Sequence, residues 1–150
     1  MVQNMSLREF EKNGWIRPHT TSRQEIQDLL SIVTRDLRDA EVNELSADWR
    51  FGIAYNGALK LCTVLLYTQG YRSGTGSHHM RTIATLPHIG DLRTQVDADY
   101  LNTCRRKRNI VEYDYAGGAT DKDADELIAF TKEFQNDLIN WLCSAYPEFM

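Results

Sequence analysis

The segment 46–69 constrains the fold of this sequence more than any other stretch. Its apolar residues recur at helical spacing and also fill much of the remaining helix surface, so the segment predicts a helix that is buried most of the way round. Ser46 stands before it as an N-cap, and Gly70 follows it as a suitable left-handed residue at the C-terminal end. A helix of this kind requires other helices around it, which predicts a helical bundle.

Four other segments have amphipathic patterns at helical spacing. They cover residues 22–42, 78–89, 92–111 and 121–145, and the residues that precede them as caps are Ser22, Ser77, Asp91 and Thr120. Val96 falls on the expected buried face of the segment 92–111. Strand-like alternation of useful length does not appear, and the connections are short, which favours antiparallel neighbours. The predicted fold is therefore all-α: an up-down antiparallel bundle of four main helices plus a short N-terminal helix.

The chain of 150 residues has the length of one domain. Residues 1–21 are expected to form an N-terminal arm packed on the bundle, with a short helix over Ser6–Lys12 followed by an extended piece. Trp15 and Ile16 anchor the arm in this interpretation, because a large aromatic side chain left in water forgoes its burial energy. Residues 22–150 are expected to form the bundle itself.

Small residues occur along the segment 46–69, among them Gly52, Gly57 and Ala58. They allow another helix to approach closely. That helix belongs either to the same chain or to a second copy of it, so the sequence leaves open both a tight intramolecular crossing and a homodimer.

The composition is that of an ordinary globular domain, with 42% hydrophobic and 25% charged residues. The formal net charge of −4 argues against a protein that coats nucleic acid, but it leaves room for a local basic site. The sequence has no apolar run of about 18 residues that would predict a membrane span, and its N-terminus has no signal-peptide pattern. We therefore expect a cytoplasmic protein without membrane contact.

The three cysteines, Cys62, Cys104 and Cys143, are far apart and form no CxxC pair, so they do not predict a zinc site. Each lies among apolar residues, and buried free thiols are the expectation. His78 and His79 are adjacent, and adjacent side chains on a helix point about 100° apart, which makes a poor chelate. The sequence therefore predicts no metal and no cofactor. The two histidines are expected on the surface near a turn, where they can line a cleft.

The strongest candidate site begins at residues 105–108, which are four consecutive cations. An apolar pair at 110–111 anchors a segment that also carries amide, carboxylate and phenol groups. The polar members are Arg105, Arg106, Lys107, Arg108, Asn109, Glu112, Tyr113, Asp114 and Tyr115. Donors, acceptors and charges placed this densely are typical of a binding site. The plainer alternative is the solvated end of a long helix, where cations favour the C-terminal dipole.

Residues 108–115 read Arg-Asn-Ile-Val-Glu-Tyr-Asp-Tyr and resemble the Arg-Asn-x-x-x-His-x-Tyr pattern of the toxin branch of the HEPN superfamily (higher eukaryotes and prokaryotes nucleotide-binding domains). Arg108, Asn109 and Tyr115 match the pattern, and Tyr113 stands at the position of its histidine. The helix around residues 54–58, the turn at 70–72 and the helix that begins at 78–79 also agree with this family. The resemblance covers roughly residues 22–145 and implies a small helical bundle, often dimeric.

The resemblance implies a nucleotide- or RNA-binding module that is not catalytic. The ligand-binding residues implied are Arg105, Arg108, Asn109, Tyr113, Asp114, Tyr115, His78 and His79. In this set Arg108 would contact phosphate, the amide and the carboxylate would hold the motif or a base edge, and the phenols would offer stacking faces worth about 1–3 kcal/mol per base. The family context further implies a nucleotidyltransferase partner protein or a place in a toxin–antitoxin or defence system.

Two alternatives stay open at this point. The first is a metal-independent RNase of the HEPN toxin type, with Arg108 and Tyr113 as catalytic residues. A phenol has an ordinary pKa near 10 and is a weak base at neutral pH, so nearby cations would have to lower that pKa. The second is a structural helical scaffold, in which Arg108 only pairs with a carboxylate such as Glu112 or Asp125.

Overall fold

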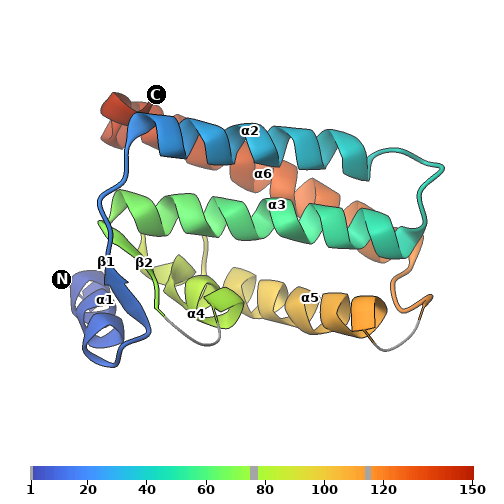
Figure 1. The fold of residues 1–150 in the computed structure, drawn as a ribbon, viewed down its shortest axis with the longest axis horizontal. Coiled ribbons are helices and arrows are strands. Elements are labelled where there is room, and N and C mark those ends of the chain that lie inside the picture. The colour runs from blue at the N-terminus through green and yellow to red at the C-terminus, as the bar shows by residue number, and fades with distance from the viewer. Residues whose placement is uncertain (1, 75–77, 114–115) are drawn as a thin grey trace.

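The computed structural model describes residues 2–74, 78–113 and 116–150. The α-helices are α1 (Val2–Lys12), α2 (Arg23–Ala40), α3 (Ala47–Thr68), α4 (His78–Thr85), α5 (Gln95–Tyr113) and α6 (Asp121–Ala145). Two short strands, β1 (Ile16–Pro18) and β2 (Tyr71–Ser73), and two 3₁₀ turns, η1 (Leu86–His88) and η2 (Pro147–Phe149), complete the described elements. The long helices α2, α3, α5 and α6 alternate in direction along the chain (Figure 1), so the predicted all-α up-down bundle is confirmed.

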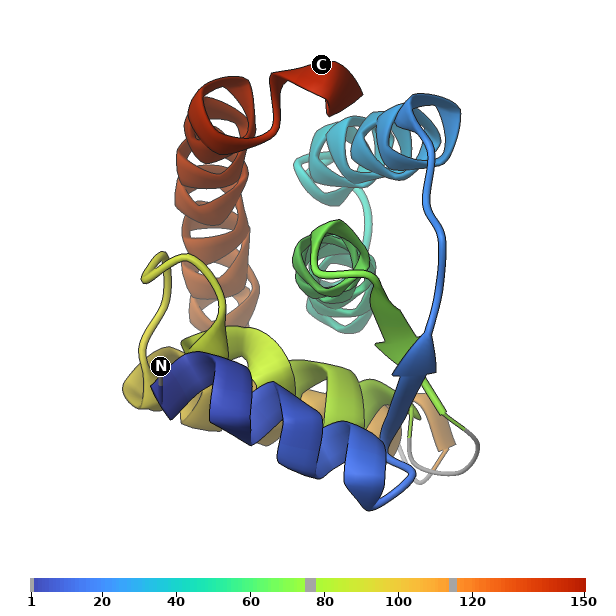
Figure 2. The ribbon, with the colours of Figure 1, turned by 90° about the vertical axis from the view of Figure 1, so that its left-hand side faces the viewer.

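Helix α3 is the centre of the bundle. It packs against α2, α4, α5 and α6, and Figure 2 shows it end-on with α2, α5 and α6 around it. Its buried residues run from Arg50 to Leu66 and occupy several faces of the helix. The expectation that this segment is buried most of the way round is confirmed. A side chain of α3 that faces α4 and α5 can therefore contact residues of a site on those two helices.

The small residues of α3 allow close crossings within the chain. A Cβ atom placed on Gly57 would lie 3.5 Å from Cγ2 of Thr131 on α6 and 3.8 Å from Cβ of Asp36 on α2. A larger residue at this position would have to push both helices away. At Gly57 the close partner is therefore intramolecular, and the homodimer stays a prediction.

The start predicted for the fourth long helix is wrong. Asp91 does not cap it but has a left-handed backbone, with φ of 53°, directly after Gly90. Thr94 is the capping residue instead: its hydroxyl accepts from the backbone N–H of Asp97 at 3.4 Å, and the Asp97 carboxylate accepts from the backbone N–H of Thr94 at 3.0 Å. Val96 then falls in the first turn of α5 on the outer side and is 75% exposed, so its predicted burial is wrong as well.

The two strands form an antiparallel ribbon that the sequence did not predict. Ile16 pairs with Ser73, Arg17 with Arg72, and Pro18 with Tyr71. Strands of three residues are too short to show a period of two, which explains the miss. The ribbon ties the N-terminal segment to the end of α3, because β2 follows α3 after a single left-handed turn at Gly70.

The N-terminal segment lies against the bundle through several apolar contacts. Helix α1 begins at Val2, four residues earlier than predicted. Leu7 and Ile16 belong to the buried core, and Phe10 stacks on Trp15 with ring centroids 5.5 Å apart. The guanidinium of Arg81 on α4 lies 5.4 Å from the Trp15 ring. The arm therefore shares contacts with α4, the helix that carries His78 and His79.

The cysteines differ in exposure. Cys62 and Cys104 are buried free thiols, as predicted, but Cys143 is exposed. Its sequence neighbours include buried Leu142, yet a helix turns about 100° per residue, so position 143 of α6 points outward. None of the helices among the described residues is both long and apolar enough to cross a membrane.

Candidate functional site

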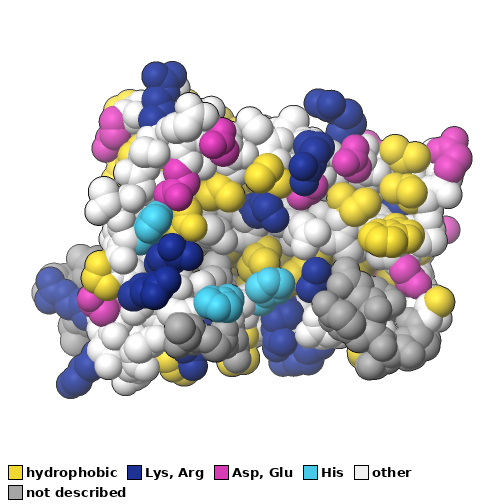
Figure 3. Space-filling view, viewed as in Figure 1, with side chains coloured by type: hydrophobic (Ala, Val, Ile, Leu, Met, Phe, Trp, Pro, Cys, Tyr) yellow, Lys and Arg dark blue, Asp and Glu magenta, His cyan; other side chains and the backbone are white. Residues whose placement is uncertain are grey.

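A cleft of about 280 Å³ lies between the start of α4 and the second half of α5. Its lining residues are His78, His79, Met80, Arg105, Arg108 and Asn109. The structure thus brings together five residues that the sequence analysis proposed from two separate segments. In Figure 3 histidine side chains and Lys or Arg side chains adjoin each other over α4 and α5.

Helix α5 supplies the arginine side of this cleft, called here the α4–α5 cleft. Arg105, Arg108 and Asn109 are three and four positions apart, so they share one face of the helix. Arg105 Nε donates to Asn102 Oδ1 at 3.2 Å, which holds its guanidinium along the helix. Lys107, in the same run of cations, points elsewhere: its ammonium lies 3.2 Å from Asp123 on α6. Of the four cations, two therefore line the cleft, Lys107 forms an ion pair, and Arg106 is exposed.

Tyr55 of α3 contacts two of the residues that line the α4–α5 cleft, His79 and Arg108. Its side chain is fully buried, and its hydroxyl lies 3.2 Å from Nδ1 of His79. The guanidinium carbon of Arg108 lies 5.6 Å from the centre of the Tyr55 ring, a cation–π distance. Burial raises the pKa of Tyr55 far above its usual range, so the phenol stays protonated and can donate to His79. One buried phenol thus contacts both the histidine and the arginine.

The surroundings of His79 favour its neutral form. Burial lowers its pKa from 6.5, and the positive charges of Arg108 and Arg105 lower it further. A neutral imidazole whose Nδ1 accepts from Tyr55 carries its proton on Nε2. Binding of an anion next to the two arginines would offset part of their positive charge and so favour protonation of His79. The cleft can therefore take up an anion and a proton together.

His78 joins this cleft to the β-ribbon. Its Nδ1 lies 3.1 Å from the hydroxyl of Ser73 on β2. His88 of η1 is not among the residues that line the cleft and packs edge-on to Phe10 with ring centroids 5.5 Å apart. The described residues include no group of three or more His, Cys, Asp or Glu that could hold a metal ion.

Three of the proposed site residues fall outside this description. Tyr113 is the last residue of α5, but its side chain lies outside the described part, as do Asp114 and Tyr115 entirely. Asp125, the carboxylate suggested as a structural partner of Arg108, instead accepts from Arg50 at 2.6 Å. Tyr55 is the site residue that the sequence analysis missed, since it was assigned to the apolar stripe of α3. A tyrosine on an otherwise apolar stripe is a usable signal, because a buried hydroxyl needs a partner.

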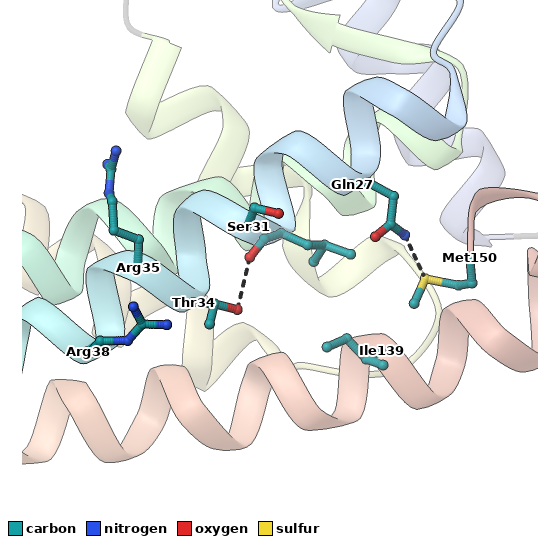
Figure 4. Close-up of a pocket in the computed structure, with 8 residues that line it drawn as sticks. Gln27, Ser31, Thr34, Arg35, Arg38, Ile139 and Met150 are labelled. Carbon is teal, nitrogen blue, oxygen red and sulfur yellow. Dashed lines mark hydrogen bonds between the residues drawn. The ribbon is translucent and has the colours of Figure 1, made fainter.

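A larger groove, of about 500 Å³, runs between α2 and α6. Figure 4 shows its lining, and the polar groups there are mostly used within the protein. Thr34 donates to the Leu30 carbonyl at 3.2 Å and accepts from Gln135 at 3.0 Å, and Gln27 donates to the Phe149 carbonyl at 2.8 Å. The guanidinium of Arg35 points away from α6 in Figure 4. This groove is a weaker candidate than the α4–α5 cleft, where two arginines of α5 meet two histidines of α4.

Comparisons of the chain with protein-family models, with curated proteins and with solved structures found no match. The case for a function consequently depends on the residues of the α4–α5 cleft and on the resemblance of residues 108–115.

Proposed function

We propose that the protein is a HEPN-like module that binds the phosphate of a nucleotide or an RNA in the α4–α5 cleft and does not catalyse a reaction there. The observation that carries this proposal is the convergence of Arg105 and Arg108 with His78 and His79 on one cleft, in a chain whose net charge is −4. A guanidinium presents paired donors that match two oxygens of a phosphate.

The electrostatics of the cleft support an anionic ligand. The charges that lower the pKa of His79 come from Arg108, Arg105, His78 and Lys60, all basic residues. Basic groups gathered in this way repel one another, and an anion placed between them removes that repulsion. The resemblance adds the partners: a nucleotidyltransferase protein, a second copy of the chain, or the other component of a toxin–antitoxin or defence system.

The direct test measures RNA binding by two variants that each remove one cation from α5. Arg108→Ala removes a guanidinium from the cleft, whereas Lys107→Ala removes a neighbouring cation whose partner is Asp123. Charge-assisted hydrogen bonds contribute about 1.5–3 kcal/mol, so Arg108→Ala should weaken binding by about 10–100-fold. Fluorescence anisotropy with a labelled single-stranded RNA at several salt concentrations gives both the affinity and its salt slope.

Equal effects of the two substitutions would count against a specific cleft and favour the structural scaffold. The scaffold alternative also requires that nucleotides and RNA leave the melting temperature unchanged, because a ligand that binds the native state must stabilise it.

One observation favours a second function, a metal-independent RNase. His79 lines the cleft with Arg108, and its lowered pKa favours the neutral imidazole, so the cleft contains an acid–base group even though the motif has Tyr113 at the histidine position. In this reaction His79 would use the tautomer whose Nδ1–H donates to the Tyr55 oxygen, so that Nε2 could take the proton of a ribose 2′-hydroxyl as that oxygen attacks phosphorus and the bond to the 5′-oxygen breaks. The leaving oxygen would take a proton from water, and Arg108 would stabilise the charge on the phosphorane.

Incubation of RNA with the protein in EDTA distinguishes binding from cleavage. Cleavage that persists in the chelator, is lost in His79→Gln and remains in His88→Gln would establish the RNase. Intact RNA at high protein excess would leave the binding module as the better account.

A further inference from the structure

The β-ribbon places two arginines directly opposite each other. Arg17 of β1 and Arg72 of β2 are cross-strand partners, and both side chains are exposed. Like charges in directly opposed positions of an antiparallel pair destabilise it. A ribbon of two three-residue strands has few other interactions to offset this cost. The arginine pair therefore does not serve the stability of the ribbon, which suggests a role in binding.

The carboxylate of Glu25 is not paired with either of these arginines. Glu25 is close enough to Arg72 to be influenced by its charge, but Glu25 already accepts from His19 at 2.7 Å and from Thr21 at 2.8 Å. Burial opposes ionisation of Glu25, yet these two hydrogen bonds and the charges of His19 and Arg72 outweigh it and lower its pKa. Within the described residues, neither Arg17 nor Arg72 forms an ion pair within 4.0 Å.

The arginine pair adjoins the α4–α5 cleft. Ser73, the residue after Arg72, is bonded to His78 at 3.1 Å, and His78 lines the cleft. In Figure 3 Lys, Arg and His side chains adjoin one another from the ribbon past α4 to α5, whereas basic and acidic side chains are mixed over α2. The ribbon arginines and the cleft thus form one continuous basic surface.

We propose that Arg17 and Arg72 are a second phosphate-binding element, and that the ligand of the cleft is a single-stranded RNA whose backbone runs from the cleft over the ribbon. This inference depends on the proposed function of the cleft and narrows its ligand. A mononucleotide carries phosphate at one place only, so a mononucleotide bound in the cleft would not contact the ribbon arginines. A cleft of about 280 Å³ admits a phosphate or a splayed-out base, groups that a single strand presents and a stacked duplex does not.

The test compares affinity with RNA length in three proteins. Labelled oligouridylates from two to twelve nucleotides are titrated into the native protein, into Arg17→Ala/Arg72→Ala, and into the control Arg38→Ala/Lys122→Ala, which removes two exposed cations from α2 and α6. The ribbon variant is expected to bind the longest RNA at least tenfold more weakly than the control. Its salt slope should fall by about 1.4, because each phosphate contact of a single strand contributes about 0.7. Binding of the shortest RNA should be unchanged.

Three results separate the ways in which the inference can fail. If the ribbon variant matches the control at every length while Arg108→Ala abolishes binding, the ribbon has no role and the cleft function stands. If the ribbon substitutions lower the affinity for the shortest RNA as much as that for the longest, the ribbon and the cleft are one site and the inference is overturned. If the native protein binds no RNA of any length, the proposed function and this inference fall together. Thermal melting of the ribbon variant checks folding, and removal of the repulsion should leave its melting temperature equal or higher.

Discussion

Removal of one hydroxyl tests the contact between Tyr55 and the cleft residue His79. In Tyr55→Phe the aromatic ring and its packing stay, and only the bond of the hydroxyl to His79 Nδ1, 3.2 Å long, is lost. A neutral hydrogen bond contributes about 0.5–1.5 kcal/mol, and the half-buried imidazole can recruit water, so we expect a loss of about 1 kcal/mol in the free energy of unfolding. For a domain of this length that corresponds to a fall of about 2–4 °C in melting temperature.

The same substitution has an effect that a purely structural role would not produce. The bond between the phenol and Nδ1 differs in strength between the neutral and the protonated imidazole, so its removal should change the pKa of His79, which burial and nearby cations lower from 6.5. The assay combines thermal melting with NMR titration of the histidine side chains. Tyr67→Phe is the matched control, since Tyr67 is on the same helix and its hydroxyl makes no hydrogen bond to another described residue. Equal melting shifts in both variants, together with an unchanged titration of His79, would refute the Tyr55–His79 contact.

Three further predictions concern stability and reactivity. Arg50→Ala should cost about 2 kcal/mol, measured by urea denaturation, because it removes a buried guanidinium that donates to the last carbonyl of α2 at 2.8 Å and bridges to α6. A thiol reagent should label one cysteine of the native protein, the exposed Cys143, and all three after denaturation, since burial raises the pKa of Cys62 to about 12 and that of Cys104 to about 11. The pKa of His79 is lower in the folded chain, so its contribution to stability should be complete above pH 6.5 and be lost as pH falls through the folded pKa, and His79→Gln should reduce this dependence in melts across pH.

The helices of this fold are readable from the sequence because their apolar stripes are long and their caps are local. Thr120 caps α6 as predicted and forms both hydrogen bonds of a capping box with Asp123, and Gly70 has the left-handed backbone expected after α3. The start of α5 was misread because two successive residues with positive φ, Gly90 and Asp91, form a turn that looks like a cap. Local propensity did not reveal that the true cap was three residues further on.

The candidate site was only partly readable. The arginine face of α5 followed from spacing within one helix, but its approach to the histidines depends on how α4 packs against α5, which no local pattern encodes. The role of Tyr55 could not be predicted because its ring fits the buried face of α3. The sequence pattern does not show that its hydroxyl also contacts a histidine of another helix. The β-ribbon was missed because it pairs residues 16–18 with residues 71–73, which are far apart in the sequence. Strands of three residues are also too short to give a recognisable sequence pattern.

An NMR titration of the four histidines with single-stranded RNA tests the central claim most directly, because two of them line the α4–α5 cleft and two do not. The account predicts that RNA shifts the signals of His78 and His79 and raises the pKa of His79, since phosphate offsets the charge of the nearby arginines. It also predicts that His19 keeps its signal with short RNA and that His88 keeps its signal with RNA of any length. Saturable binding that leaves His78 and His79 unchanged would place the ligand elsewhere and contradict the account.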